Sequence, residues 1–542
     1  MAQPSARPDA VSEISRAVAL HQQGQFDEAA QLYDVILTAA PDRPDVLNLL
    51  GLARYQQGRN AEALRLIGAA LARADKSADI INNFALVLAA LGRQEEALAH
   101  FEKALAITAD HVNALANRAD TLKRLKRDEE ALAAYARLLT VQPDHLGAMN
   151  ESGGLNTRLG RPAAALAHYD RALAIASAAE LYVNKGTALR ALNRDDEALA
   201  SFAAAAAVRP DCAEAHWNAA LVRLRHGDFA TGWRDYEWRW RKADWAGRQR
   251  DFASPPWRGG GPIAGKTVFL HAEQGFGDTI QFARYARLVA ERGATVVLEC
   301  QPQLKSLLQN IDGVAHVIAA GEPLPPFDVH CPLLSLPLAL GTELATVPCG
   351  VPYIRPPAER TEKWRDRLPS GGRLRVGLCW AGSGAHLSDR HRSISLDQFC
   401  QILSVDGIDF VSLQKEVGPL DAALLRTHAV AQPSADFADF ADTAAVIAML
   451  DLIISVDTSV VHLAGAMGKP VALLLPFSPD FRWMLDRDDS PWYPTMRLFR
   501  QTTLGGWDSV IARVRDALVE IVRRPGIAPG IAPGIGWRVA LR

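Results

Sequence analysis

The sequence predicts a multidomain chain in which an all-α repeat array is followed by an α/β region of two doubly wound lobes. Three observations predict this. The first half repeats with a period of about 34 residues, the second half alternates short apolar strands with helices, and 542 residues are too many for one core. Apolar residues make up 49% and charged residues 22%, which is typical of globular proteins. A formal net charge of −2 argues against a nucleic-acid-binding protein, which normally has a basic face.

One position recurs through the first half, and two others follow it at fixed distances. A residue able to adopt a left-handed turn stands at Gly24, Gly58, Gly92, Lys126, Gly160, Asn193 and Gly227. A small residue follows five positions later, at Ala29, Ala63, Ala97, Ala131, Ala165, Ala198 and Gly232. A bulky residue follows nine positions after the first, at Tyr33, Ile67, Phe101, Tyr135, Tyr169, Phe202 and Tyr236. Glycine or asparagine suits a tight turn between helices, and the small residue lets two helices approach closely.

This pattern resembles the tetratricopeptide repeat, with about seven helix pairs over residues 11–240 and a flexible N-terminus over residues 1–10. Stacked repeats form a superhelix with a concave surface. The resemblance implies a protein or peptide partner in that groove, and a spacer or dimerisation arm is the alternative. Asparagines recur on the first helices at Asn83, Asn117, Asn184 and Asn218. They either clamp the backbone of a bound peptide or lie on a solvated helix face.

A cluster of aromatic residues follows the last repeat. It consists of Trp233, Tyr236, Trp238, Trp240, Trp245 and Trp257. We call this cluster the aromatic seam. We expect it to join the last helix pair to the next domain, because exposed tryptophans would be a liability. A stacking platform for a sugar is the alternative. Residues 241–265 are predicted to be a linker, since proline and glycine are frequent from Ser254 to Gly265.

The second half predicts two parallel-sheet lobes, over residues 266–360 and 361–525. Strands are expected at 267–272, 294–300 and 328–334 in the first lobe, and at 374–380, 409–413, 450–456 and 470–475 in the second. Helices are expected at 280–292 and 507–524. Residues 526–542 are a low-complexity tail without an inferable role. Because ligands of doubly wound sheets lie at the carboxyl ends of the strands, the loops there are the candidate site.

The loop after the first strand contains Gly275, Gly277 and Asp278. The glycines allow a ligand to approach the backbone closely. Asp278 stands at or near a helix start, where an aspartate often only caps the helix. The alternative is a carboxylate that projects into the cleft and acts as a general base on an acceptor hydroxyl.

Loops after two strands of the second lobe offer groups for a phosphate. Small residues around Ser383 follow the first of these strands and precede Arg390 and Arg392. Small residues leave backbone N–H groups free, and such groups together with two arginines suit a diphosphate. Surface solubility is the competing interpretation of these arginines. Gln414 and Lys415 follow the next strand. Lys415 can reach a phosphate, although a lone lysine is more often only solvated.

The most informative loop joins a buried strand to a helix of small residues and contains Asp457, Thr458, Ser459 and His462. Thr458 and Ser459 stand at the positive end of the helix, which suits an anion. Asp457 can hold the turn or a ribose hydroxyl. His462 lies one turn into the helix, where a histidine is either a ligand-binding residue or a packing residue.

These four loops together resemble glycosyltransferase family 9, the heptosyltransferase-like enzymes, over about residues 266–525. Gly277-Asp278 matches the family's first-lobe loop, and the resemblance implies that Asp278 is the base. Asp457-Thr458-Ser459-Val460-Val461-His462 matches the family's Asp-Thr-Gly-x-x-His signature, with serine in place of glycine. By the Arg-Ser-Ile pattern, the family's basic residue falls on Arg392. The joining of repeats to such lobes also resembles protein O-GlcNAc transferases, in which a phosphate-binding lysine has a placement similar to Lys415.

The resemblance implies an inverting, metal-independent glycosyltransferase of the GT-B fold, with a nucleotide diphosphate sugar as co-substrate, no bound cofactor and an acceptor on a protein or surface glycan. A scaffold protein with degenerate transferase lobes is the alternative, and an epimerase of the same fold is a third possibility. The 6 cysteines form no metal-binding or disulfide pattern. Asp486, Asp488 and Asp489 form an Asp-x-Asp string far in sequence from the strand-end loops, so we predict no metal site. No segment has transmembrane length, and we expect a cytoplasmic protein.

Overall fold

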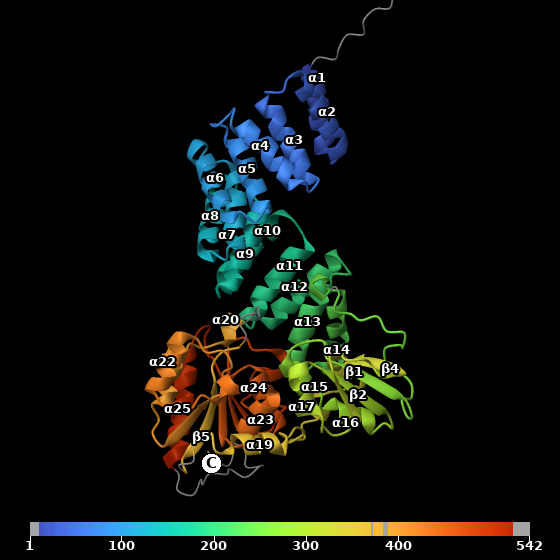
Figure 1. The fold of residues 1–542 in the computed structure, drawn as a ribbon, viewed down its shortest axis with the longest axis vertical. Coiled ribbons are helices and arrows are strands. Elements are labelled where there is room, and N and C mark those ends of the chain that lie inside the picture. The colour runs from blue at the N-terminus through green and yellow to red at the C-terminus, as the bar shows by residue number, and fades with distance from the viewer. Residues whose placement is uncertain (1–9, 246, 370–371, 383–388, 524–542) are drawn as a thin grey trace, which may run out of the picture. The chain divides into compact units, whose positions relative to one another are not determined.

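The computed structural model describes residues 10–245, 247–369, 372–382 and 389–523, and the chain divides into two compact units, residues 1–185 and 186–542. Figure 1 shows helical repeats in the first unit and both helices and sheets in the second. Of the flexible N-terminus predicted for residues 1–10, only residue 10 is described. The predicted tail at 526–542 lies outside the described residues.

The first unit is built of consecutive helix pairs. Its helices are α1 (Ala10–Gln22), α2 (Phe26–Ala39), α3 (Pro44–Gln56), α4 (Asn60–Leu71), α5 (Ala78–Ala90), α6 (Gln94–Ile107), α7 (Val112–Arg124), α8 (Asp128–Val141), α9 (Leu146–Arg158), α10 (Pro162–Ile175) and the start of α11 (Ala179–Ala191). The predicted turn position has a left-handed backbone in every repeat, including the two non-glycine residues, Lys126 at φ 60° and Asn193 at φ 55°. The turn prediction is therefore confirmed.

The small and bulky repeat positions form the core of the repeats, and both sets are buried throughout. Their fit is tight: a Cβ built on Gly153 would lie 2.5 Å from the ring of Tyr169. Three of the four recurring asparagines form hydrogen bonds with other asparagines on the neighbouring repeat. Asn117 Nδ2 donates to Asn82 Oδ1 over 3.0 Å, and the same kind of contact joins Asn83 to Asn48 and Asn184 to Asn150. Asn218 instead donates to the carbonyl of Glu214 over 2.8 Å.

The second unit begins within the sixth repeat and continues without interruption into two parallel sheets. Its repeat helices are the rest of α11, α12 (Asp195–Val208), α13 (Ala213–Arg225) and α14 (Phe229–Tyr236), followed by the 3₁₀ turns η1 (Glu237–Arg241) and η2 (Ala243–Trp245). Trp233 lies against the rings of Phe282 and Phe481, and Phe229 stacks on Trp492. The aromatic seam therefore joins the last repeat to both lobes, as the first of its two interpretations predicts.

The first lobe has a four-stranded parallel sheet in the order β3-β2-β1-β4. Its elements are β1 (Thr267–His271), α15 (Phe276–Phe282), α16 (Tyr285–Ala290), β2 (Thr295–Cys300), η3 (Pro302–Leu304), α17 (Lys305–Leu308), β3 (His316–Ala319), β4 (Val329–Pro332), η4 (Leu333–Ser335), α18 (Leu336–Ala339) and η5 (Leu344–Thr346). The single helix predicted at 280–292 is wrong: two helices stand there, α15 beginning at Phe276 and α16 at Tyr285. The predicted linker is also more ordered than a spacer, since Trp257 is buried and its backbone N–H donates to the carbonyl of His330 over 2.7 Å.

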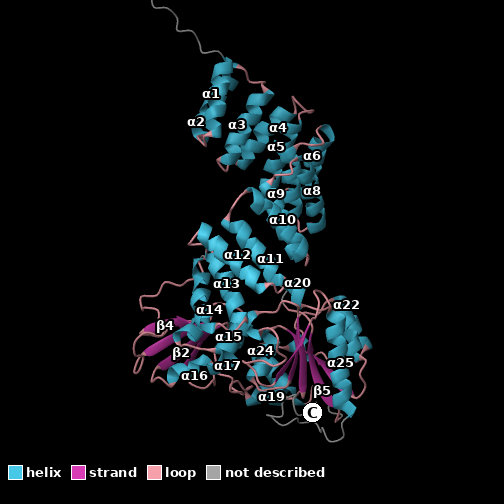
Figure 2. Ribbon diagram, turned by 180° about the vertical axis from the view of Figure 1, so that it is seen from behind, coloured by secondary structure: helices cyan, strands magenta, loops and turns pink. Residues whose placement is uncertain are grey.

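The second lobe has a five-stranded parallel sheet in the order β6-β5-β7-β8-β9. Its elements are α19 (Ala358–Arg365), β5 (Leu374–Cys379), α20 (Asp389–Arg392), α21 (Leu396–Leu403), β6 (Ile408–Ser412), α22 (Pro419–Thr427), η6 (Pro433–Asp436), α23 (Phe440–Ala448), β7 (Leu452–Val456), α24 (Ser459–Ala466), β8 (Val471–Leu475), η7 (Phe481–Trp483), β9 (Met496–Arg500) and α25 (Trp507–Arg523). In Figure 2 the helices α22 and α25 lie on one side of this sheet and α19 and α24 on the other. Both strands that the sequence did not predict, β3 and β9, are edge strands.

The two lobes are held together by side chains that cross between them. Arg284, at the start of α16 in the first lobe, is buried and donates to the carbonyl of Trp492 in the second lobe over 2.7 Å. Ser306 donates to Asp439 over 2.6 Å. The lobes therefore share one interface, and the loops at the carboxyl ends of β1 and β7 lie in it.

Candidate functional site

The loop after β1 and the turn after β7 meet where α15 packs against α24. The contact is close at Gly277: a Cβ there would lie 2.7 Å from Cδ2 of His462 and 3.5 Å from Cα of Ser459. A glycine is required because the two helix starts leave no room for a side chain. The predicted carboxylate loop and the predicted anion-binding turn are thus neighbours.

Asp278 is the third residue of α15, and both of its carboxylate oxygens have partners. Oδ2 accepts the N–H of Gly275 over 2.9 Å, which caps the helix start. Oδ1 accepts from Nη2 of Arg482, a residue of the second lobe. Asp278 therefore caps its helix, as one of its two interpretations predicts, and also forms an ion pair across the lobe interface.

Arg482 is the centre of this ion-pair cluster. Its Nε donates to Oε1 of Gln281 over 2.6 Å, and its Nη1 donates to Oδ1 of Asp480 over 2.9 Å. The side chain is only 9% exposed. Burial works against its charge, but the carboxylates of Asp480 and Asp278 outweigh burial and hold the pKa of Arg482 above its usual value. Arg482 is therefore a fixed cation that binds one lobe to the other beside Asp278.

Asp457 and His462 share a buried polar pocket in the second lobe. Trp483 Nε1 donates to Oδ2 of Asp457 over 2.9 Å, and Nε2 of His462 lies 3.9 Å from Oδ1 of Asp457. Burial, with the nearby charge of Asp480, raises the pKa of Asp457 to about 6. Burial and neighbouring arginines lower the pKa of His462, so it is neutral at neutral pH. Its Nδ1 lies 3.0 Å from the hydroxyl of Tyr493.

Thr458 is the N-cap of α24, and its Oγ1 accepts the N–H of Val460 over 3.3 Å. The loop after β5 comes to the same place, because Nη1 of Arg392 donates to the carbonyl of Asp457 over 3.0 Å. A Cβ on Gly382 would lie 2.5 Å from Nη2 of Arg392, so the guanidinium passes close to the backbone of this loop. The structure thus places Arg392 beside the turn that contains Asp457, Thr458 and Ser459.

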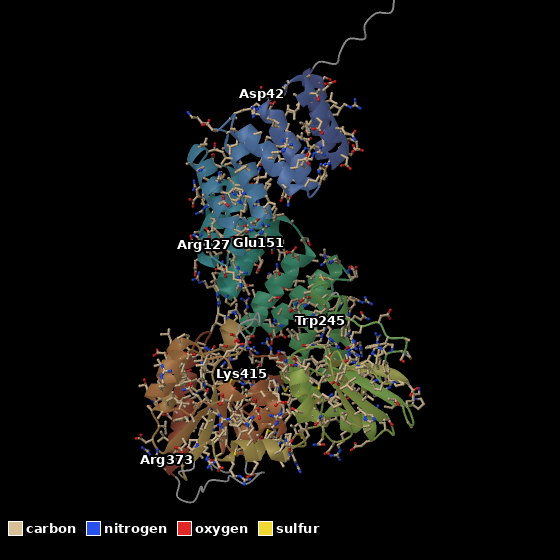
Figure 3. The ribbon with its side chains drawn as sticks, in the orientation of Figure 1. Asp42, Arg127, Glu151, Trp245, Arg373 and Lys415 are labelled. Carbon is tan, nitrogen blue, oxygen red and sulfur yellow. The ribbon has the colours of Figure 1, made fainter. Side chains whose placement is uncertain are left out.

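The other predicted donor-binding residues are placed differently. Nζ of Lys415, labelled in Figure 3, donates to the carbonyl of Phe437 over 2.7 Å. Gln414 is buried, and its Oε1 accepts the N–H of Ala381 over 3.1 Å, so it holds the loop after β5. Arg390 is exposed. Ser383 lies outside the described residues.

Sequence reasoning missed Arg482, Trp483 and the contacts they make. A usable signal was present, since η7 follows β8, and the carboxyl end of every strand in such a sheet is a candidate position.

In the Asp-x-Asp string, Asp489 accepts from Nε of Arg487 over 2.7 Å. Across the described ranges, no three His, Cys, Asp or Glu side chains gather in a way that could hold a metal ion. No described helix is long and apolar enough to cross a bilayer.

Comparisons with known families agree with this organisation. Tetratricopeptide-repeat family models match residues 42–110 and residues 14–44, 117–180 and 183–244. The family model of glycosyltransferase family 9 (heptosyltransferase) matches residues 437–483, which include the turn after β7 and η7. The chain thus carries tetratricopeptide repeats followed by an α/β region that is similar to glycosyltransferase family 9.

Relatives of the chain are distant. Protein FlbA of Caulobacter vibrioides is 26% identical over 333 residues, which cover 57% of this chain and 55% of that protein, so the match spans about half of the relative's length. The solved structure of Pseudomonas aeruginosa PilF is 17% identical over 38% of this chain and 94% of that chain, with a TM-score of 0.35. PilW, a type IV pilus biogenesis factor, is 20% identical over 39% of this chain and 98% of that chain, with a TM-score of 0.36. These TM-scores are too low to support a conclusion about function.

Proposed function

We propose that the chain is an inverting glycosyltransferase of the GT-B type that moves a sugar from a nucleotide diphosphate sugar to an acceptor hydroxyl. The observation that carries the proposal is the contact between Gly277 and His462, which sets Asp278 beside the start of α24. The match of residues 437–483 to glycosyltransferase family 9 supports it independently. A carboxylate from one lobe and a helix start from the other are the two groups that this reaction needs.

In the proposed reaction Asp278 takes the proton of the acceptor hydroxyl, and the hydroxyl oxygen attacks the anomeric carbon. The bond from that carbon to the diphosphate oxygen breaks, and the nucleoside diphosphate leaves with the electron pair. The N–H groups at Thr458 and Ser459 and the guanidinium of Arg392 are suited to stabilise the charge that develops on the leaving group. Arg482 holds Asp278 in position and must release at least part of its contact for Asp278 to accept a proton.

The supporting groups require no metal ion in this proposal, since cationic side chains and a helix start neutralise the diphosphate. Lys415 joins them only if a bound phosphate competes with the carbonyl of Phe437 for its ammonium. The repeats are proposed to dock the acceptor or a partner protein. The acceptor is then a protein or a surface glycan.

A scaffold with inactive lobes is a second candidate, and one observation favours it. Both oxygens of Asp278 are already engaged, one by Gly275 and one by Arg482. A carboxylate so held is a weaker base than a free one, because hydrogen bonds and a cation stabilise its charged form.

The two candidates are separated by incubating the purified full chain with a panel of nucleotide diphosphate sugars and measuring release of the nucleoside diphosphate. We expect turnover with one donor and loss of turnover in Asp278→Asn, which retains an oxygen for Arg482. A wild-type chain that binds a donor, as shown by a raised unfolding temperature, but releases no product from any of the panel supports the scaffold. Release of free sugar at equal rates in wild type and Asp278→Asn contradicts the role given to Asp278.

A further inference from the structure

The loop that follows β8 is held by the last repeats as well as by its own lobe. It consists of residues 476–480, which we call the β8 loop, and it leads into η7, which carries Arg482. Within the second lobe, the N–H of Phe477 donates to Oε1 of Gln501 over 3.1 Å. The β8 loop also contacts the turn between α11 and α12 and the end of α13. Two repeats therefore reach a loop of the candidate site.

Asn193 binds the β8 loop from the turn between α11 and α12. Its Nδ2 donates to the carbonyl of Phe477 over 2.8 Å, and its Oδ1 accepts from Nη1 of Arg225 over 3.1 Å. The backbone at Asn193 is left-handed, with φ 55°, and five of the seven repeats have glycine at this position. Glycine adopts such a turn without strain, so the turn itself does not require an asparagine. The contact with the β8 loop explains why an asparagine stands there.

Arg225, the last residue of α13, binds the same loop. Its Nη1 donates to Oγ of Ser478 over 2.8 Å, and this Oγ donates in turn to the carbonyl of Arg190 over 2.9 Å. Arg225 also forms an ion pair with Asp195, and the two side chains are only 2% and 5% exposed. The buried ion pair fixes the guanidinium in place. The repeats therefore present a rigid surface to the β8 loop.

The β8 loop positions two residues of η7 that reach both halves of the candidate site. Asp480, the last residue of the loop, accepts the backbone N–H of Arg482 over 3.0 Å and also accepts from Nη1 of its side chain. Arg482 in turn contacts the carboxylate of Asp278. The neighbouring Trp483 donates to Oδ2 of Asp457 over 2.9 Å. A shift of the loop would therefore displace the partners of both aspartates together.

The loop before Asp278 is held by the end of the same repeat array. Nε2 of Gln274 donates to the hydroxyl of Tyr236, the last residue of α14, over 2.9 Å. Nη2 of the buried Arg239, in η1, donates to Oε1 of Glu273 over 3.2 Å. The end of the repeat array thus contacts the loops of both lobes that meet at Asp278.

We infer that the last two repeats are part of the site, and that Asn193 and Arg225 are positioning residues that hold Arg482 against Asp278. This role rests on the proposed function, in which Asp278 is the base. The two residues touch neither the donor nor the acceptor, and they act through the β8 loop. A reaction between groups from two lobes is sensitive to displacement of either group, and a shift of about 1 Å can cost ~100-fold in rate.

The test compares Asn193→Gly with the matched control Lys126→Gly in the full chain. Lys126 is the other non-glycine residue at this turn position, with φ 60°, and within the described ranges its side chain makes no hydrogen bond or ion pair. Both changes put glycine where the backbone is left-handed, so both variants should fold. A third variant, Arg225→Lys, keeps a cation for Asp195 but loses the forked guanidinium that reaches the β8 loop at the same time.

The first measurement is hydrogen–deuterium exchange of the free protein, followed by mass spectrometry. The amides of Trp483 and Met484 form the backbone hydrogen bonds of η7, so their exchange reports how firmly the β8 loop holds this turn. We expect peptides covering residues 477–484 to exchange ~3-fold or more faster in Asn193→Gly than in wild type, with β5 and β7 unchanged. Lys126→Gly should exchange like wild type in all of these segments.

The second measurement is steady-state turnover of the donor that the nucleotide-sugar panel selects. We expect kcat to fall ~10-fold or more in Asn193→Gly while the donor KM stays within ~3-fold, because the groups that react are displaced and the start of α24 is retained. Lys126→Gly should match wild type in both constants. A variant that is merely less stable would instead lose activity in proportion to its unfolded fraction, which calorimetry of the same samples measures.

The inference is overturned if exchange over residues 477–484 is the same in wild type, Asn193→Gly and Arg225→Lys, or if Lys126→Gly raises it equally. An active wild type whose kcat is unaffected by Asn193→Gly also overturns it and leaves the proposed function standing. A wild type that turns over no donor overturns the proposed function, and faster exchange in Asn193→Gly then still shows that the repeats hold the β8 loop.

Discussion

Replacing Arg482 by alanine tests the ion-pair cluster that joins the two lobes. The change removes the cation shared by Asp278, Asp480 and Gln281. Breaking a buried ion pair by deleting one partner costs about 3–5 kcal/mol, because the other charge is left uncompensated. Asp480 is 36% exposed and water can solvate part of its charge, so we expect the lower end, about 3 kcal/mol.

The assay is differential scanning calorimetry of the full chain, with Arg487→Ala as the matched control. Arg487 stands five positions after Arg482 and pairs with Asp489. The two side chains of this pair are partly exposed, at 27% and 37%, and such pairs contribute about 0–1 kcal/mol. For the transition of the second unit we expect a fall of at least ~5 °C in Arg482→Ala and about 2 °C or less in Arg487→Ala. Equal shifts in the two variants would refute the placement of a buried cation at Arg482.

Three further outcomes follow from single contacts. Gly277→Ala places a Cβ 2.7 Å from Cδ2 of His462, and this overpacking should destabilise the second unit by about 1–3 kcal/mol and lower its unfolding midpoint. Gly260→Ala is the control, because no atom lies within 4 Å of its added Cβ, and it should leave the midpoint unchanged. The pKa of His271 falls from its usual value to about 3 on folding, so the unfolded chain binds the proton more readily than the folded chain does. Acidification should therefore lower the stability of the chain by about 1.4 kcal/mol for each pH unit below 6.5. In acid titrations followed by circular dichroism, His271→Gln should flatten this slope. Asn82→Ala should destabilise the first unit by about 1–3 kcal/mol in urea unfolding, because it deletes the acceptor of an inter-repeat hydrogen bond, and an unchanged midpoint would mean that the bond is not formed.

Much of the fold could be predicted because it follows from local rules. The left-handed turns at Lys126 and Asn193 occupy a position that five glycines define, and the strand β8 is an uninterrupted apolar run. The strand β3 escaped prediction because only its last residue is buried, and β9 because two arginines interrupt its apolar residues at a sheet edge. Edge strands of this kind lack the buried pattern that marks a central strand.

The site was predictable only in part, because its central contact joins residues far apart in sequence. The loops of Asp278 and Thr458 were identified from strand ends, and their proximity follows from the packing of α15 on α24. Arg482 was missed because an isolated arginine carries no local signal, and its importance comes from meeting a carboxylate 204 positions away.

The most direct test of the shared site is to measure donor affinity and turnover together in wild type and Asp278→Asn, using the nucleotide diphosphate sugar that the panel selects. If Asp278 is the base and the start of α24 holds the diphosphate, the variant should keep the wild-type Kd while its turnover falls ~100-fold or more. Unchanged turnover in Asp278→Asn, with donor binding intact, would contradict the account.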